Sequence, residues 1–103
     1  MLHMKKTLNG HKYASAYTIL DRDGVTLISY TTKVCHIDSE GFLTCSGLYS
    51  RTTMKHIGWF MREYVPHIAG GYVMAKEAYL HNYAINIFTG EVKHLDGEKT
   101  GIA

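Results

Sequence analysis

The side chains best suited to chemistry in this sequence are two cysteines and seven histidines. Cys35 and Cys45 lie in strand-like segments on either side of the turn-like run Asp38-Ser39-Glu40-Gly41. With a three-residue turn centred on Glu40, the two cysteines face each other on adjacent strands with Cβ atoms about 5 Å apart. Such a pair predicts half of a tetrahedral zinc site, a cross-strand disulfide, or two reduced, half-buried thiols.

The spacing of these residues favours the reduced thiols. Neither a C-x₂-C nor an H-x₃₋₅-H spacing occurs in the chain, so the indication of zinc is weak. A disulfide is disfavoured in a reducing cytoplasm, which is where we expect this protein. We therefore expect no bound metal and no cofactor.

Catalytic groupings are poor. His36 or His56 with either cysteine would supply a base and a nucleophile, but no third orienting residue stands at a recognisable spacing. Gly70-Gly71 lacks the following Lys-Ser/Thr of a phosphate-binding loop. The nine carboxylates include no close pair on one predicted face. We expect that the protein is not an enzyme and has no catalytic residues.

The only tryptophan lies in "TTMKHIGWFMREY", residues 52–64, where apolar residues recur with the helical period. On a helical wheel, Trp59 lies opposite the middle of the apolar stripe, among basic residues. Trp and Arg dominate the energetics of protein interfaces, so this composition indicates a contact patch. The stripe comprises Met54, Ile57, Phe60, Met61 and Tyr64, and the opposite face comprises Arg51, Thr52, Lys55, His56, Trp59, Arg62 and Glu63.

Three interpretations of this face remain open. The first is a protein-binding surface, with the partner-binding residues Trp59, Lys55, Arg62, Arg51 and His56. In the second, Trp59 stacks on a base of a nucleic acid while the basic side chains bind phosphates. In the third, the segment 66–103 folds over the helix and makes Trp59 part of the core. We expect Trp59 to be at least partly exposed in the isolated chain.

The elements that position these residues begin with a hairpin. Two strand-like runs flank Asp23-Gly24, and with these two residues at the centre of the turn, Leu20 faces Leu27 and Ile19 faces Ile28. The chain then continues through Cys35 and returns through Cys45, which predicts a three-stranded antiparallel meander.

A helix over Met54 to Tyr64 follows, with Ser50, Thr52 or Thr53 as its cap and Pro66 at its end. Residues 72–80 read as a short second helix or as a strand. Residues 83–95 read as a strand, a turn at Thr89-Gly90 and a return in which Ile87 faces Val92. The fold class is therefore α+β: an antiparallel sheet of four or five strands with one main amphipathic helix across one face.

Length and charge limit the remaining choices. The 103 residues predict a single domain over 1–103, with 1–10 a flexible leader and 96–103 a frayed tail. The net charge of +2 does not by itself indicate a nucleic-acid-binding protein. No apolar run approaches the roughly 18 residues that a membrane span needs. The sequence leaves the oligomeric state open between a monomer and a homodimer.

One long stretch, "SYTTKVCHIDSEGFLTCSGLYSRTTMKHIGWFMREY", with "NIFTGEV" further on, resembles a family of small proteins carried by phages, prophages and plasmids of Gram-positive bacteria. The matching residues run from Ser29 and Tyr30 through "YSRTTMKHIGWF" to the turn Thr89-Gly90-Glu91, and the cysteines lie outside the pattern. The resemblance implies an accessory protein of a mobile element that binds and inhibits a host protein, such as a CRISPR effector nuclease, as anti-CRISPR proteins do. A nucleic-acid-binding accessory role is the alternative.

Overall fold

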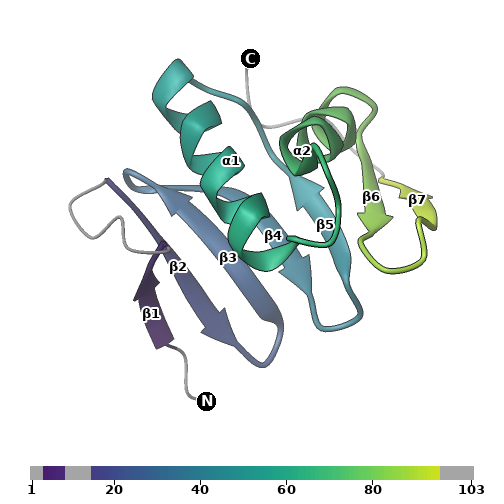
Figure 1. The fold of residues 1–103 in the computed structure, drawn as a ribbon, viewed down its shortest axis with the longest axis horizontal. Helices are drawn as coiled ribbons and strands as arrows, with labels where there is room; N and C mark the ends of the chain where they lie inside the picture. The colour runs from purple at the N-terminus through teal and green to yellow at the C-terminus, as the bar shows by residue number, and fades with distance from the viewer. Residues whose placement is uncertain (1–3, 9–14, 96–103) are drawn as a thin grey trace.

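The structure, a computed structural model, describes residues 4–8 and 15–95, which form seven strands and two helices (Figure 1). The order along the chain is β1 (Met4–Thr7), β2 (Ala16–Asp21), β3 (Gly24–Ser29), β4 (Thr32–Asp38), β5 (Phe42–Cys45), α1 (Arg51–Tyr64), α2 (Gly71–Leu80), β6 (Tyr83–Asn86) and β7 (Val92–His94).

The strands form one antiparallel sheet in which spatial order follows chain order, from β1 at one edge to β7 at the other. Both helices cover the same face of this sheet: α1 contacts β3 and β4, and α2 contacts β5 and β6 (Figure 1). The α+β class is confirmed, but the sheet is wider than the four or five strands expected. One additional strand is β1, "MKKT", whose two lysines hide the strand pattern in the sequence. The other arises because the chain turns at Tyr30 and Thr31, so that the run expected as one strand divides into β3 and β4 and the expected three-stranded meander has four strands, β2 to β5.

Part of the expected leader is therefore structured. Residues 4–7 pair with β2, from Met4 opposite Leu20 to Thr7 opposite Tyr17, and Leu8 is fully buried. The expectation of a flexible segment over 1–10 was wrong for residues 4–8, because Leu8 joins the core and ties the strand to it. The remaining leader residues and the expected tail at 96–103 lie outside the described residues.

Helix α1 begins one turn earlier than its apolar stripe suggests. Ser50 is the N-cap, and its Oγ accepts the backbone N–H of Thr53 at 3.2 Å, which selects one of the three candidate caps. Val65 caps the other end, just before Pro66. The core beneath the helix includes Ile57, Phe60 and Met61, as the stripe predicted.

The hairpin of β2 and β3 has a different register from the one expected. Leu20 faces Val25 and Ile19 faces Thr26, so Arg22 and Asp23 form the centre of the turn. The Oδ1 of Asp21 accepts the N–H of Asp23 at 2.9 Å, which stabilises this turn. Gly24 instead starts β3 with φ of 132°, where any Cβ would collide with the carbonyl oxygen of Ile37.

The second hairpin, between β4 and β5, has the predicted register. Cys35 faces Cys45, and Ile37 faces Leu43. The Oδ1 of Asp38 accepts the N–H groups of Glu40 and Phe42, both at 2.9 Å, and so holds the three-residue turn.

Residues 72–80, which the sequence allowed to be either a helix or a strand, form the helix α2. In the last hairpin Ile85, not Ile87, faces Val92. The turn is longer than expected because the Oδ1 of Asn86 accepts the N–H groups of Phe88 and Thr89, while Ile87 donates to Gly41 on the neighbouring hairpin.

Within the described part of the chain, neither helix has the length and apolar character needed to cross a membrane.

Candidate functional site

The surface around the tryptophan combines aromatic rings with cations. The Nζ of Lys55 lies over the indole of Trp59, 5.4 Å from the ring centroid. The imidazole of His56 lies 5.4 Å from the indole and 6.0 Å from the ring of Tyr30. Arg51, Lys55 and Arg62 are exposed. We name the exposed and partly exposed members the Trp59 surface: Tyr30, Arg51, Lys55, Trp59 and Arg62.

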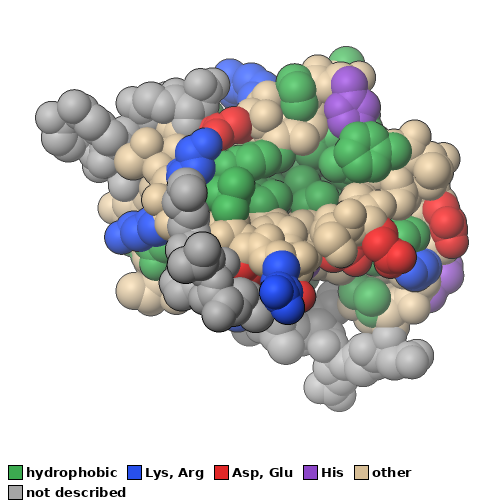
Figure 2. Space-filling model, turned by 90° about the horizontal axis from the view of Figure 1, so that it is seen from below, with side chains coloured by type: hydrophobic (Ala, Val, Ile, Leu, Met, Phe, Trp, Pro, Cys, Tyr) green, Lys and Arg blue, Asp and Glu red, His purple; other side chains and the backbone are tan. Residues whose placement is uncertain are grey.

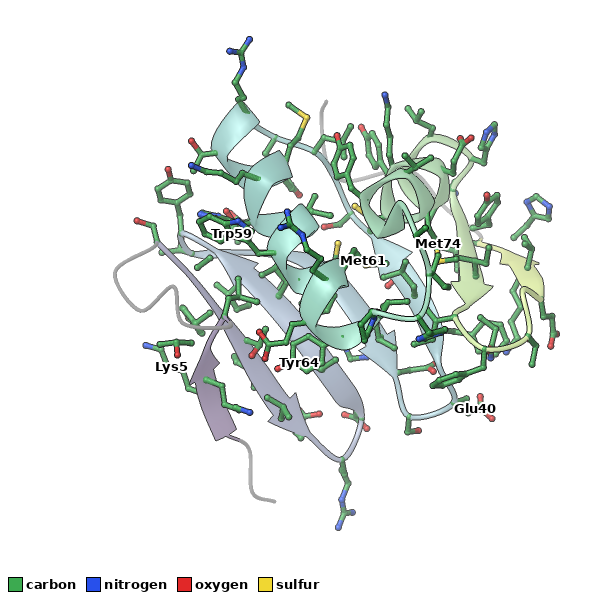
Figure 3. All side chains as sticks on the ribbon, in the orientation of Figure 1. Lys5, Glu40, Trp59, Met61, Tyr64 and Met74 are labelled. Carbon is green, nitrogen blue, oxygen red and sulfur yellow. The ribbon has the colours of Figure 1, made fainter. Side chains whose placement is uncertain are left out.

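Trp59 is partly buried and packs against the core cluster. Figure 3 shows Trp59 and Met61 on opposite sides of α1, and α2 lies on the side of Met61. The described part of the segment after α1 therefore packs away from Trp59, and the prediction that Trp59 is at least partly exposed is confirmed. On the side of Trp59, which Figure 3 labels, the sheet extends beyond α1 as β2 and β1.

His56 is not on the exposed flank where the helical wheel placed it. Only 2% of its surface is exposed, and its Nδ1 lies 2.8 Å from the hydroxyl of Ser29 on β3. The same hydroxyl lies 3.1 Å from that of Thr53. The buried side of α1 is thus displaced toward Thr53 and His56, because Ser29 gives their polar atoms a partner inside the core. The expected role of His56 as an exposed contact residue was wrong, and its place in the site is support beneath Trp59.

Tyr30 is the member of this surface that sequence analysis missed. It sits in the turn between β3 and β4 with φ of 59°, and its side chain is 53% exposed. A non-glycine residue in the left-handed region is uncommon. Here the N–H of Tyr30 donates to the carbonyl oxygen of Ser15 at 2.6 Å, which fixes the turn beside β2. A turn at this position, where one continuous strand through Cys35 was expected, is what exposes the ring.

The two cysteines are reduced, buried neighbours. Only 3% of Cys35 and 9% of Cys45 are exposed, and both belong to the core cluster. The neighbouring Cys45 thiol, together with burial, raises the pKa of Cys35, while the neighbouring Cys35 thiol lowers the pKa of Cys45. The Sγ of Cys45 donates to the carbonyl oxygen of Gly47 at 3.7 Å. Among residues 4–8 and 15–95, no three His, Cys, Asp or Glu side chains gather in a way that could hold a metal ion.

A second surface, at the opposite end of α1, was also missed. Figure 2 shows hydrophobic side chains gathered on the end of the molecule that carries the turns β2–β3, β4–β5 and β6–β7. Phe88 is 73% exposed there and stacks on His67, with ring centroids 5.6 Å apart. A groove of about 390 Å³ runs beside it. Its apolar walls come from Leu20, Val25, Ile37, Tyr64, Ile87 and Phe88, with Asp21 and Asp38 at the edge.

Carboxylates concentrate at this end of the molecule. In an antiparallel meander, the turns β2–β3, β4–β5 and β6–β7 must lie at one end of the sheet. These three turns carry Asp21, Asp23, Asp38, Glu40 and Glu91 but only one cation, Arg22. The acidic turns are visible in the sequence once the meander is known, so this signal was available but was not used.

Residues 2–83, most of the chain, match the family of unknown function DUF8033, and the chain belongs to that family. Neither the curated proteins nor the solved structures contain a match to the chain.

Proposed function

We propose that this protein acts by binding another protein through the Trp59 surface. The observation that carries the proposal is the arrangement of exposed Tyr30 and partly exposed Trp59 beside Lys55, on a helix flank held in place by buried His56. Aromatic and arginine side chains that a partner desolvates dominate the energy of protein interfaces. Rigid support beneath such an anchor reduces the entropy lost on binding.

A nucleic-acid partner is the second candidate, favoured by the exposed cations Arg51, Lys55 and Arg62. Two observations rank it lower. The ammonium of Lys55 already lies over the indole of Trp59, so a base would have to displace it in order to stack. The carboxylates of the three turns also repel a polyanion that extends along the molecule.

The resemblance to proteins of mobile elements supports a finer proposal. The partner is then a protein of the bacterial host, and the effect of binding is inhibition, as for an anti-CRISPR protein acting on a defence nuclease. An inhibitor of this kind works by occupying a surface, which requires an anchor and a stable scaffold, and the Trp59 surface supplies the anchor.

The test uses a charge reversal on the surface with a matched control elsewhere. Lys55→Glu changes the Trp59 surface, whereas Lys76→Glu makes the same change at an exposed position of α2, on the other side of α1. Wild type and Lys76→Glu should retain the same host proteins from a lysate of a Gram-positive bacterium, and Lys55→Glu should lose them at least tenfold. Equal retention by all three forms would refute the proposal.

Nuclease treatment and salt separate the two candidate partners. Protein capture that persists after nuclease and falls only mildly between 50 and 200 mM salt supports the protein partner, whereas phosphate-dominated binding falls steeply, by as much as about 10³-fold where some six phosphates are contacted. Loss of all bound material on nuclease treatment would favour the nucleic-acid candidate. Iodide quenching of Trp59 fluorescence in the presence of a captured partner then reports directly whether this indole becomes buried.

A further inference from the structure

The pair Cys35 and Cys45 joins two adjacent strands in a geometry that suits a covalent bond. The N–H of Ser46 donates to the carbonyl oxygen of Val34 at 2.8 Å, one position along the ladder from the cysteines. Hydrogen-bonded and non-hydrogen-bonded pairs alternate along an antiparallel ladder. The cysteines therefore occupy a non-hydrogen-bonded pair, where Cα atoms are about 4.5 Å apart and side chains are closest.

This separation falls within the range of roughly 4.4–6.8 Å that disulfides span. The two thiols are reduced and buried on facing residues of β4 and β5, and the Sγ of Cys45 donates to the carbonyl oxygen of Gly47 at 3.7 Å. Both residues also line a cavity of about 410 Å³ that includes Lys33, His36 and Ser46 in its wall. A cavity of this size is large enough for a small organic molecule.

We propose that Cys35 and Cys45 form a thiol–disulfide exchange site that takes a low-molecular-weight disulfide of the glutathione class as its substrate. The pair then switches between the dithiol and a cross-strand disulfide between β4 and β5. This inference is independent of the partner-binding role of the Trp59 surface.

The exchange proceeds in two balanced steps. Cys45, the more exposed thiol and the one whose pKa is lowered, loses its proton, and its sulfur attacks one sulfur of the small disulfide. A mixed disulfide forms, and the departing small thiolate takes up the proton. The sulfur of Cys35 then loses its proton and attacks the Sγ of Cys45, releasing the second small thiol. Two electrons pass from the protein to the small disulfide, and two small thiols leave.

The experiment incubates the folded protein with oxidised glutathione and follows its mass and its thiol content. The expected product has lost two hydrogen atoms, carries no glutathionyl group and returns to the starting mass with dithiothreitol. Closing a short loop should raise the Tm by roughly 5–15 °C. A folded protein that stays reduced, or that gains two glutathionyl groups, while the urea-unfolded chain is fully oxidised, would overturn the proposal.

Single variants test the order of the steps. Cys35→Ser keeps the attacking thiol and should trap the mixed disulfide at Cys45, whereas Cys45→Ser should react at least tenfold more slowly. Equal rates for both variants would contradict the assignment of Cys45 as the attacking thiol. If a variant fails to fold, the rate at which the wild-type protein reacts with oxidised glutathione is measured at increasing denaturant concentration instead. A rate that rises in step with global unfolding would show that the thiols react only in the unfolded chain and would overturn the proposal.

Discussion

Truncation of Phe60 tests whether α1 is held to the sheet by its apolar side. Phe60 is fully buried, and its ring lies 5.1 Å from that of Tyr64. Removing a buried phenylalanine side chain loses its transfer free energy and leaves a cavity, which together cost about 3–5 kcal/mol. A domain of this length has a total unfolding free energy of about 5–15 kcal/mol, so Phe60→Ala removes a large part of it.

Phe88→Ala is the matched control, because it deletes the same atoms from a side chain that is 73% exposed. Phe88 stacks on His67 and lies against Gly41 but is mostly in solvent, so its truncation should cost less than about 1 kcal/mol. For a domain of this size each kcal/mol shifts the Tm by about 4–8 °C. Thermal unfolding followed by circular dichroism should therefore show a Tm lowered by roughly 15–30 °C for Phe60→Ala and by only a few degrees for Phe88→Ala. Equal shifts in the two variants would refute the assigned facing of α1.

Three further outcomes follow from the described contacts. Gly58→Ala should raise the unfolding free energy by about 0.5–1 kcal/mol, because Gly58 lies inside α1 and a Cβ there meets nothing closer than the Arg62 side chain at 4.0 Å. Urea titration measures this change, and a destabilised variant would contradict the expectation. His56→Ala should cost about 1–3 kcal/mol or more by leaving Ser29 without its ring partner, and a double-mutant cycle with Ser29→Ala should show coupling above about 0.5 kcal/mol. Burial raises the pKa of Tyr64, so its contribution to stability is complete below the ordinary tyrosine pKa and is lost as the pH rises through the folded value; the alkaline loss of stability should be smaller in Tyr64→Phe.

The β4–β5 hairpin shows where sequence reasoning succeeds. Asp38 and Gly41 set the length of the turn locally, through an Asx side chain and a residue with φ of 96°, and the register of the cysteines follows from that length. The β2–β3 hairpin shows the limit. Asp21 and Asp23 are both residues that stabilise turns, so the sequence around Gly24 fits more than one register of the hairpin. Gly24 is needed at the start of β3 because a Cβ there would collide with the carbonyl oxygen of Ile37 on the next strand, and no local sequence pattern contains that contact.

For the Trp59 surface, too, the sequence predicted some residues correctly and others wrongly. The helical period correctly placed Lys55, Arg62 and Arg51 on the exposed side. It put Trp59 opposite the middle of the apolar stripe, whereas Trp59 is partly buried and packs against the core cluster. It failed for His56, because a wheel ranks residues by hydrophobicity, whereas the burial of this imidazole depends on a hydroxyl 27 residues away. A polar side chain is buried at low cost only where it finds a hydrogen-bond partner, and the position of that partner is set by the tertiary structure.

The meander also explains why a chain with a net charge of only +2 has two unlike ends. Alternate turns must share an end, so the acidic turns at 21–24, 38–41 and 87–91 gather around the apolar groove. The N-terminal half of α1 and the β3–β4 turn, with Arg51, Lys55 and Lys33, lie at the other end. A charge separation of this kind orients a molecule as it approaches a charged partner. Since the Trp59 surface includes the basic end, an acidic face on the partner would bring the indole toward it, and a phosphate backbone long enough to reach the groove would meet repulsion there.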